Sequence, residues 1–82
     1  MSNTVKEMLD IAKRYNQALT LKSKRQISEE VRRAHSDMAP IYMKVTPENG
    51  FSDVLCDLSM ELMHDIRWGR STSVDKKLNE FM

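Results

Sequence analysis

Apolar residues recur three and four positions apart along most of the chain, and this spacing constrains the fold more than any other feature of the sequence. Because an α-helix turns once in about 3.6 residues, such spacing places the apolar side chains on one helical face. Three stretches show it, with the stripes Val5, Met8, Leu9, Ala12, Tyr15 and Leu19, then Ile27, Val31, Ala34 and Met38, then Phe51, Val54, Leu55, Leu58, Leu62 and Ile66. No stretch alternates with a period of two for long enough to indicate a strand. The sequence therefore predicts an all-α fold.

The ends of these helices are predicted from residues that start or stop a helix. Thr4 and Ser23 each stand three residues before a Glu or Gln, which is the spacing of a capping box. This predicts helices over about 5–19 and 24–39. Pro40 disfavours helical geometry in the residue before it and has no amide hydrogen to donate, so the second helix is expected to end or kink there.

The third stripe is followed by Gly69, which suits the end of a helix because glycine readily adopts a positive φ. Beyond it, Val74, Leu78 and Phe81 indicate a short final helix. The 82 residues suffice for one domain, so we expect residues 1–82 to form a small bundle of three main helices with a short fourth at the C-terminus. A core of this size nets only about 3–5 kcal/mol, and a partner or a second copy of the chain would add burial.

No stretch of the sequence is apolar enough to enter a membrane. The longest uninterrupted apolar run is three residues, whereas a transmembrane helix needs about 20 and a secretory signal about 7–15. The single cysteine, Cys56, excludes an internal disulfide and is typical of a reducing compartment. We therefore expect a cytoplasmic protein that does not insert directly into a membrane.

The sequence carries no motif of an enzyme or a cofactor site. It has no glycine-rich phosphate loop, no nucleophile elbow and no Cys/His cluster spaced for a metal ion. Cys56 and His64 lie eight residues apart without a third group to orient the pair, so Cys56 is expected to be a small residue at the edge of the core. The sequence thus predicts a protein without catalytic, cofactor-binding or metal-binding residues.

The formal net charge of +1 conceals two unlike halves. Residues 1–45 contain nine Lys and Arg against five Asp and Glu, whereas residues 46–82 contain four against seven. The first half holds a basic cluster formed by Lys22, Lys24, Arg25, Arg32 and Arg33. Such a cluster could contact phosphates, but acidic residues are interleaved with it and no aromatic residue among them could stack on a base. Nucleic-acid binding is therefore the weaker alternative.

The third predicted helix carries an acidic ridge whose members, spaced four residues apart, are Asp53, Asp57, Glu61 and Asp65. Like charges at this spacing repel unless cations oppose them, and either the basic first half of the chain or a basic partner segment would do so. Methionine is common on surfaces that receive a partner's helix, and this helix holds two besides a tryptophan. The predicted partner-binding surface therefore comprises Asp53, Asp57, Met60, Glu61, Met63, Asp65 and Trp68.

The chain opens with the sequence MSNTVKEMLD and, at this length and with this helical character, resembles the RIII rapid-lysis protein family of T-even bacteriophages. The resemblance spans the whole chain. It implies a cytoplasmic co-antiholin, which delays lysis of the host by binding the cytoplasmic N-terminal segment of the phage holin. It rests on no short motif, so no binding residue is transferred from the family.

The residues are compatible with such a role, because a chain without export signals meets a membrane protein from the cytosolic side. A helical domain can also hold an amphipathic helix in a groove. We expect a non-enzymatic regulator in the host cytoplasm that sequesters the holin segment and so shifts the holin away from its lytic assembly. The alternatives are a phage or bacterial regulator that inhibits a different host protein and a small nucleic-acid-binding protein.

Overall fold

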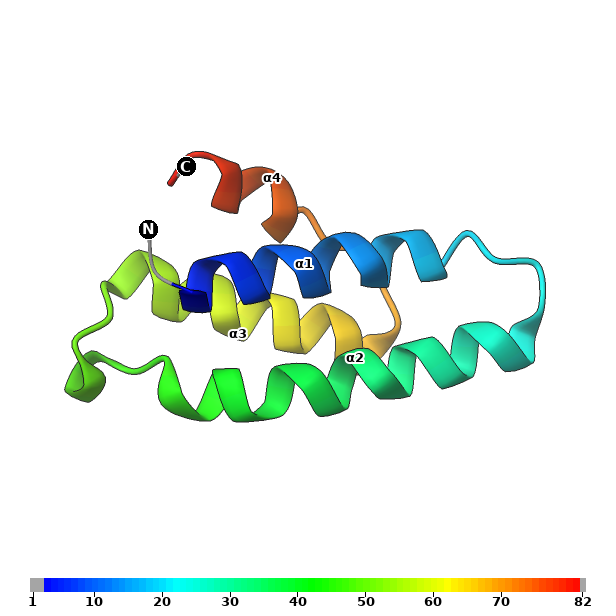
Figure 1. The fold of residues 1–82 in the computed structure, drawn as a ribbon, viewed down its shortest axis with the longest axis horizontal. Helices are drawn as coiled ribbons and strands as arrows, with labels where there is room; N and C mark the ends of the chain where they lie inside the picture. The colour runs from blue at the N-terminus through cyan, green and yellow to red at the C-terminus, as the bar shows by residue number, and fades with distance from the viewer. Residues whose placement is uncertain (1–2, 82) are drawn as a thin grey trace.

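The structure, a computed structural model, describes residues 3–81 and consists of helices joined by short loops (Figure 1). The elements are α1 (Asn3–Ala18), α2 (Lys24–Lys44), a 3₁₀ turn η1 (Pro47–Asn49), α3 (Asp53–Trp68) and α4 (Val74–Asn79). The described residues contain no strand, which confirms the predicted all-α fold with three main helices and a short fourth. Within this part of the chain, no helix combines the length and the apolar character that crossing a bilayer requires.

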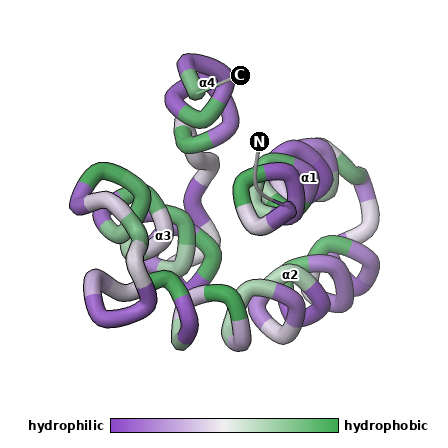
Figure 2. Tube along the Cα trace, turned by 60° about the vertical axis from the view of Figure 1, so that its left-hand side comes forward, coloured by the Kyte–Doolittle hydropathy of each residue, from purple (hydrophilic) through white to green (hydrophobic). Residues whose placement is uncertain are grey.

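The three long helices run antiparallel in succession, and α4 returns across them (Figure 1). α2 packs against both α1 and α3, whereas α1 and α3 make few direct contacts with each other. On the side away from α2, α4 lies over α1 and α3 and packs mainly on α1 (Figure 2). α3 therefore has two edges, one that faces α2 and one that faces α1 and α4.

The core lies between the four helices and is built largely from the predicted stripes. Its most deeply buried apolar members, at 0–1% exposure, are Met8, Ala12, Tyr15, Met38, Leu62, Ile66, Val74 and Leu78. Full burial of a large apolar side chain stabilises a fold by about 1.5–3 kcal/mol, so each helix is held in place by its own stripe. The two members from α4, Val74 and Leu78, dock this short helix against the core.

The second helix is longer than predicted, because α2 continues through Pro40 to Lys44. Ile41 and Val45 are 6% and 4% exposed, and they extend the buried stripe beyond the proline. Pro40 has no amide hydrogen, so the carbonyl oxygen of Ser36, four residues earlier, lacks its helical donor. Both residues are exposed, so water can donate to that oxygen instead. The predicted helix end at residue 39 is therefore wrong, because burial beyond the proline outweighs one lost hydrogen bond.

Two of the predicted helix signals are confirmed and one is wrong. The Ser23 hydroxyl accepts a hydrogen bond from the Gln26 amide at 3.3 Å, as a residue that caps a helix does. Gly69 ends α3 in the left-handed conformation, with φ of 67°. Thr4, expected to cap the first helix, lies inside α1 and is buried, because that helix already includes Asn3.

Candidate functional site

Between α2 and α3 lies a cavity of about 130 Å³, which we call the α2–α3 groove. Its lining residues are His35 and Tyr42 from α2 and Met60, Met63, His64 and Arg67 from α3. Met60 is 50% exposed and Tyr42 is 41% exposed, whereas Met63 is partly buried against the core. The groove therefore offers apolar surface to a second molecule.

Helical spacing brings the lining residues together. On α3 they occupy positions 60, 63, 64 and 67, which fall on one face over two turns. On α2, His35 and Tyr42 are seven residues apart, again two turns, on the flank that faces α3. α2 and α3 run antiparallel (Figure 1) and pack against each other. The two faces therefore meet along the groove.

The charged lining of the groove is cationic. Arg67 supplies a permanent positive charge, and no acidic residue of the described chain lines the groove. Arg67 has no ion pair with another described residue. Across residues 3–81, the side-chain hydrogen bonds and ion pairs also leave α2 and α3 unlinked, so apolar packing alone joins the two helices. The groove thus suits an apolar group that carries anionic neighbours.

The other edge of α3 is closed by hydrogen bonds from α1. The Tyr15 hydroxyl lies 2.9 Å from the Asp65 carbonyl oxygen and 2.6 Å from the Arg70 carbonyl oxygen. The Asn16 side chain donates to the Thr72 carbonyl and accepts from the Thr72 amide, each at 2.9 Å. These bonds tie α1 to the end of α3 and to the loop that leads into α4.

The Tyr15 hydroxyl is held in its neutral form by its surroundings. Burial raises the pKa of Tyr15 from 10.0 to about 12, the nearby Asp65 carboxylate adds to the rise, and Arg70 opposes it. The hydroxyl therefore keeps its single proton throughout the physiological range of pH, and can donate it to either of the two carbonyl oxygens.

The structure divides the predicted acidic ridge between the two edges of α3. The Glu61 carboxylate accepts from the Lys77 ammonium at 2.9 and 3.0 Å, so its counter-charge comes from α4 and not from the basic first half of the chain. Asp65 is partly buried on the same side. Asp53 and Asp57 are exposed and have no ion pair with a described residue. Only these last two acids are fully open to a partner.

The apolar residues of the predicted surface are also separated. Met60 and Met63 line the groove, whereas Trp68, the last residue of α3, is 67% exposed and lies outside the lining. Val54 was predicted in the buried stripe but is 55% exposed, so that prediction is wrong. Seven residues separate Val54 from Glu61, which places both on the same flank, away from the centre of the stripe.

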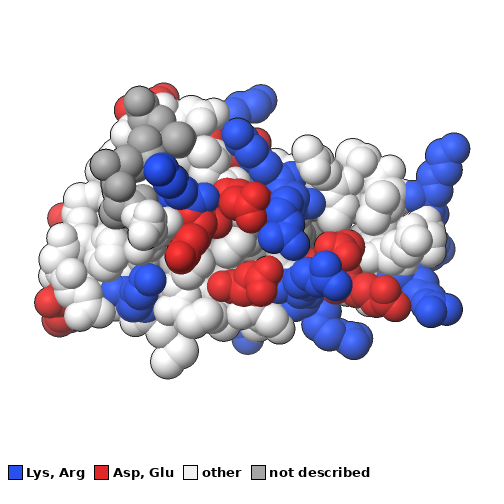
Figure 3. All heavy atoms as spheres, viewed as in Figure 1, with Lys and Arg blue, Asp and Glu red and all other residues white. Residues whose placement is uncertain are grey.

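The predicted basic cluster is interrupted by acidic partners. Arg25 lies 3.4 Å from Glu29, and Arg33 lies 3.6 Å from Glu30. The other three members are exposed and have no ion pair within the described part of the chain: Lys22, Lys24 and Arg32. Acidic and basic side chains alternate over the face shown in Figure 3. This arrangement favours an ordinary solvated surface over a track for phosphates.

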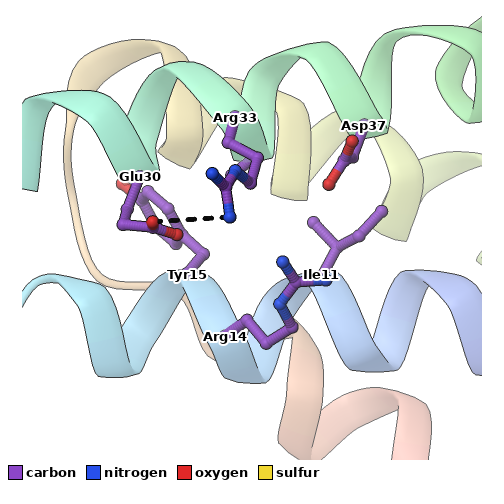
Figure 4. Close-up of a pocket in the computed structure, with 7 residues that line it drawn as sticks. Ile11, Arg14, Tyr15, Glu30, Arg33 and Asp37 are labelled. Atoms are coloured by element: carbon purple, nitrogen blue, oxygen red, sulfur yellow. Dashed lines mark ion pairs between the residues drawn. The ribbon is translucent and has the colours of Figure 1, made fainter.

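One of the cavities between α1 and α2 gathers charged side chains but leaves almost no space. Arg33 and Asp37 from α2 point toward Arg14 and Tyr15 of α1 (Figure 4). Its volume is about 10 Å³, and a single water molecule needs roughly 10–15 Å³. The cavity therefore serves packing between the helices and offers no room for a substrate.

Cys56 and His64 are not brought together as a nucleophile and its base would be. His64 lines the α2–α3 groove and Cys56 does not. Burial, followed by the charges of Asp53, Asp57 and Glu48, raises the pKa of the Cys56 thiol, which lowers its fraction of reactive thiolate. Across residues 3–81, no three His, Cys, Asp or Glu side chains are grouped to hold a metal ion.

Four lining residues of the groove were not predicted from the sequence: His35, Tyr42, His64 and Arg67. The available signal was their helical spacing beside the apolar stripes. The missing information was which helix packs beside α3, because the groove exists only where α2 and α3 meet.

Comparison of the chain with protein-family models, with curated proteins and with solved structures gives no match. The resemblance to the rapid-lysis proteins therefore stays a prediction, and function has to be inferred from the geometry of the surface.

Proposed function

We propose that this chain is a non-enzymatic protein-binding module whose α2–α3 groove receives an amphipathic segment of another protein. The observation that carries the proposal is Met60, which is half exposed beside Tyr42 and the partly buried Met63. An unbranched thioether side chain adapts its shape to an incoming apolar group, and methionines are frequent where helices dock. An amphipathic helix that lays its apolar face in a groove is an established mode of recognition.

The chemistry of the surface also supports binding over turnover. The raised pKa of Cys56 disfavours its reactive thiolate. Among the described residues that line the groove, no Ser, Thr, Cys, Asp or Glu stands beside His35 or His64 to act as a nucleophile or to orient the imidazole. Affinity in such a groove would come from apolar burial, and orientation would come from charge.

The resemblance to the rapid-lysis proteins points to the partner. On that basis the protein is a cytoplasmic co-antiholin, and the occupant of the groove is the cytoplasmic N-terminal segment of the phage holin. Occupation of that segment would withhold it from holin assembly and so shift the holin population away from the lytic state. The same groove would serve a regulator that inhibits a different host protein, which is the alternative.

Isothermal titration calorimetry with a peptide of the holin's cytoplasmic segment tests this proposal. We expect Met60→Lys to weaken binding by about tenfold or more, because it places a charge at the centre of the apolar surface. Val54→Lys is the matched control, since Val54 is similarly exposed on α3 but lies outside the groove. Absence of heat at roughly 100 μM peptide, an affinity weaker than about −5.5 kcal/mol, would contradict the holin as partner. Equal weakening by both variants would contradict the groove as its site.

A further inference from the structure

The solvent-facing surface of α3 carries acidic side chains before its midpoint and basic side chains after it. We call this surface the α3 outer face, and its exposed residues in chain order are Asp53, Asp57, Met60, His64 and Arg67. Asp53 precedes Met60 by seven residues and Arg67 follows it by seven, so the two charges lie two helical turns on either side of Met60. The acidic end and the basic end are thus equally far from an apolar centre.

We propose that the α3 outer face is a self-association surface that takes a second copy of this chain, with the two α3 helices antiparallel. A two-fold axis at Met60 places Asp53 of each copy opposite Arg67 of the other, and it brings Asp57 beside His64. Such an interface is isologous, because the same patch serves both copies. A parallel pair would instead place acid against acid and base against base. Like charges across an interface repel each other, and this repulsion disfavours the parallel orientation.

The groups that the interface needs are free within the described structure. Asp53, Asp57 and Arg67 are exposed and have no ion pair with another described residue. Met60 is 50% exposed, and the α2–α3 groove beside it provides a recess for the Met60 side chain of the second copy. A chain of this size gains little from its own core, so burial of this face would add to its stability.

The interface is small, and this sets the expected strength of association. A helix of 16 residues is about 24 Å long, so a pair of such faces buries less than the roughly 1,200 Å² of a stable interface. We therefore expect a weak dimer, half formed at roughly 100 μM. The inference does not depend on the proposed function, although a second copy and a partner segment would compete for Met60, His64 and Arg67, which also line the groove.

Sedimentation equilibrium of the purified chain, from about 5 to 500 μM, tests the proposal. We expect the apparent mass of the wild type to rise toward that of a dimer with concentration. Asp53→Lys with Asp57→Lys, and separately His64→Glu with Arg67→Glu, should each remain monomeric at the highest concentration. An equimolar mixture of the two double variants should associate again, because each supplies the charges that the other has lost. This rescue also excludes loss of folding as the cause.

Glu7→Lys with Glu80→Lys is the matched control, because it raises the net charge as much as the first double variant but changes exposed residues outside the α3 outer face. We expect this control to associate like the wild type. A wild type that stays monomeric throughout, a control that dissociates as fully as the first variant, or a mixture that fails to associate would each overturn the inference. None of these results involves a partner peptide, so the proposed function would stand or fall separately.

Discussion

The two edges of α3 are built differently. Toward α1 and α4, the edge is closed by the hydrogen bonds of Tyr15 and Asn16 and by the Glu61–Lys77 ion pair. Toward α2, no such bond is present among residues 3–81, and Met60 is half exposed. One edge satisfies its polar groups internally, whereas the other leaves apolar surface and a cation uncovered.

This difference separates the residues that hold the fold from those that are free to bind. Buried polar groups on the closed edge lose their partners when a side chain is changed, and each such loss costs about 1–3 kcal/mol. Changes to exposed side chains on the open edge usually alter stability by less than about 0.5 kcal/mol. Stability and binding should therefore respond to different sets of mutations.

The largest expected effect is on the closed edge, where Leu78 docks α4 against the core at 0% exposure. Leu78→Ala should lower the free energy of unfolding by about 2–5 kcal/mol, because it removes buried surface and leaves a cavity. Met60→Ala, on the open edge, should change it by less than about 0.5 kcal/mol. Urea denaturation followed by circular dichroism measures both. Similar losses for the two variants would show that the open edge is part of the core.

The stability of the fold should depend on pH through the ionisation of Tyr15. Its pKa is about 12 in the folded chain against 10.0 when it is unperturbed, so the folded state favours the neutral phenol. This contribution, about 3 kcal/mol at most, is fully present below pH 10 and is lost as the pH rises to about 12. Denaturation between pH 8 and about 12 should therefore show a steeper decline for the wild type than for Tyr15→Phe. Parallel profiles would mean that the Tyr15 hydroxyl is not buried as described.

The smallest expected change in stability comes from replacing two acidic residues on neighbouring turns of α3. Glu61→Gln removes the ion pair with Lys77 and should cost no more than about 1 kcal/mol, since both side chains are partly exposed. Asp57→Asn removes no ion pair to a described residue and should leave stability unchanged within about 0.5 kcal/mol. Thermal unfolding at low and high salt resolves the two, because only the Glu61 effect should fade with added salt. A larger loss for Asp57→Asn would contradict the division of the ridge.

Features that depend on neighbouring residues in the sequence could be predicted, and features that depend on packing could not. Helical periodicity identified the stripes, and the local chemistry of Ser23 and Gly69 identified two helix ends. The continuation of α2 beyond Pro40 depends on burial of Ile41 and Val45 against other helices, which no local signal records.

The candidate surface shows the same limit. The acidic ridge and the two methionines were visible in the sequence as helical spacing. Which of these residues stay open depends on where other helices dock. Lys77 of α4 forms an ion pair with Glu61, whereas α2 places His35 and Tyr42 beside Met60. Sequence could therefore indicate a candidate helix but not which of its edges is left open.

Nuclear magnetic resonance of the ¹⁵N-labelled chain, titrated with the holin peptide, would locate the binding edge without mutation. We expect the largest amide shift changes at His35, Tyr42, Met60, Met63 and Arg67, with little change in α4. Changes centred on α4, or on the basic cluster around Lys22 and Lys24, would contradict the proposal that the partner binds the edge of α3 facing α2.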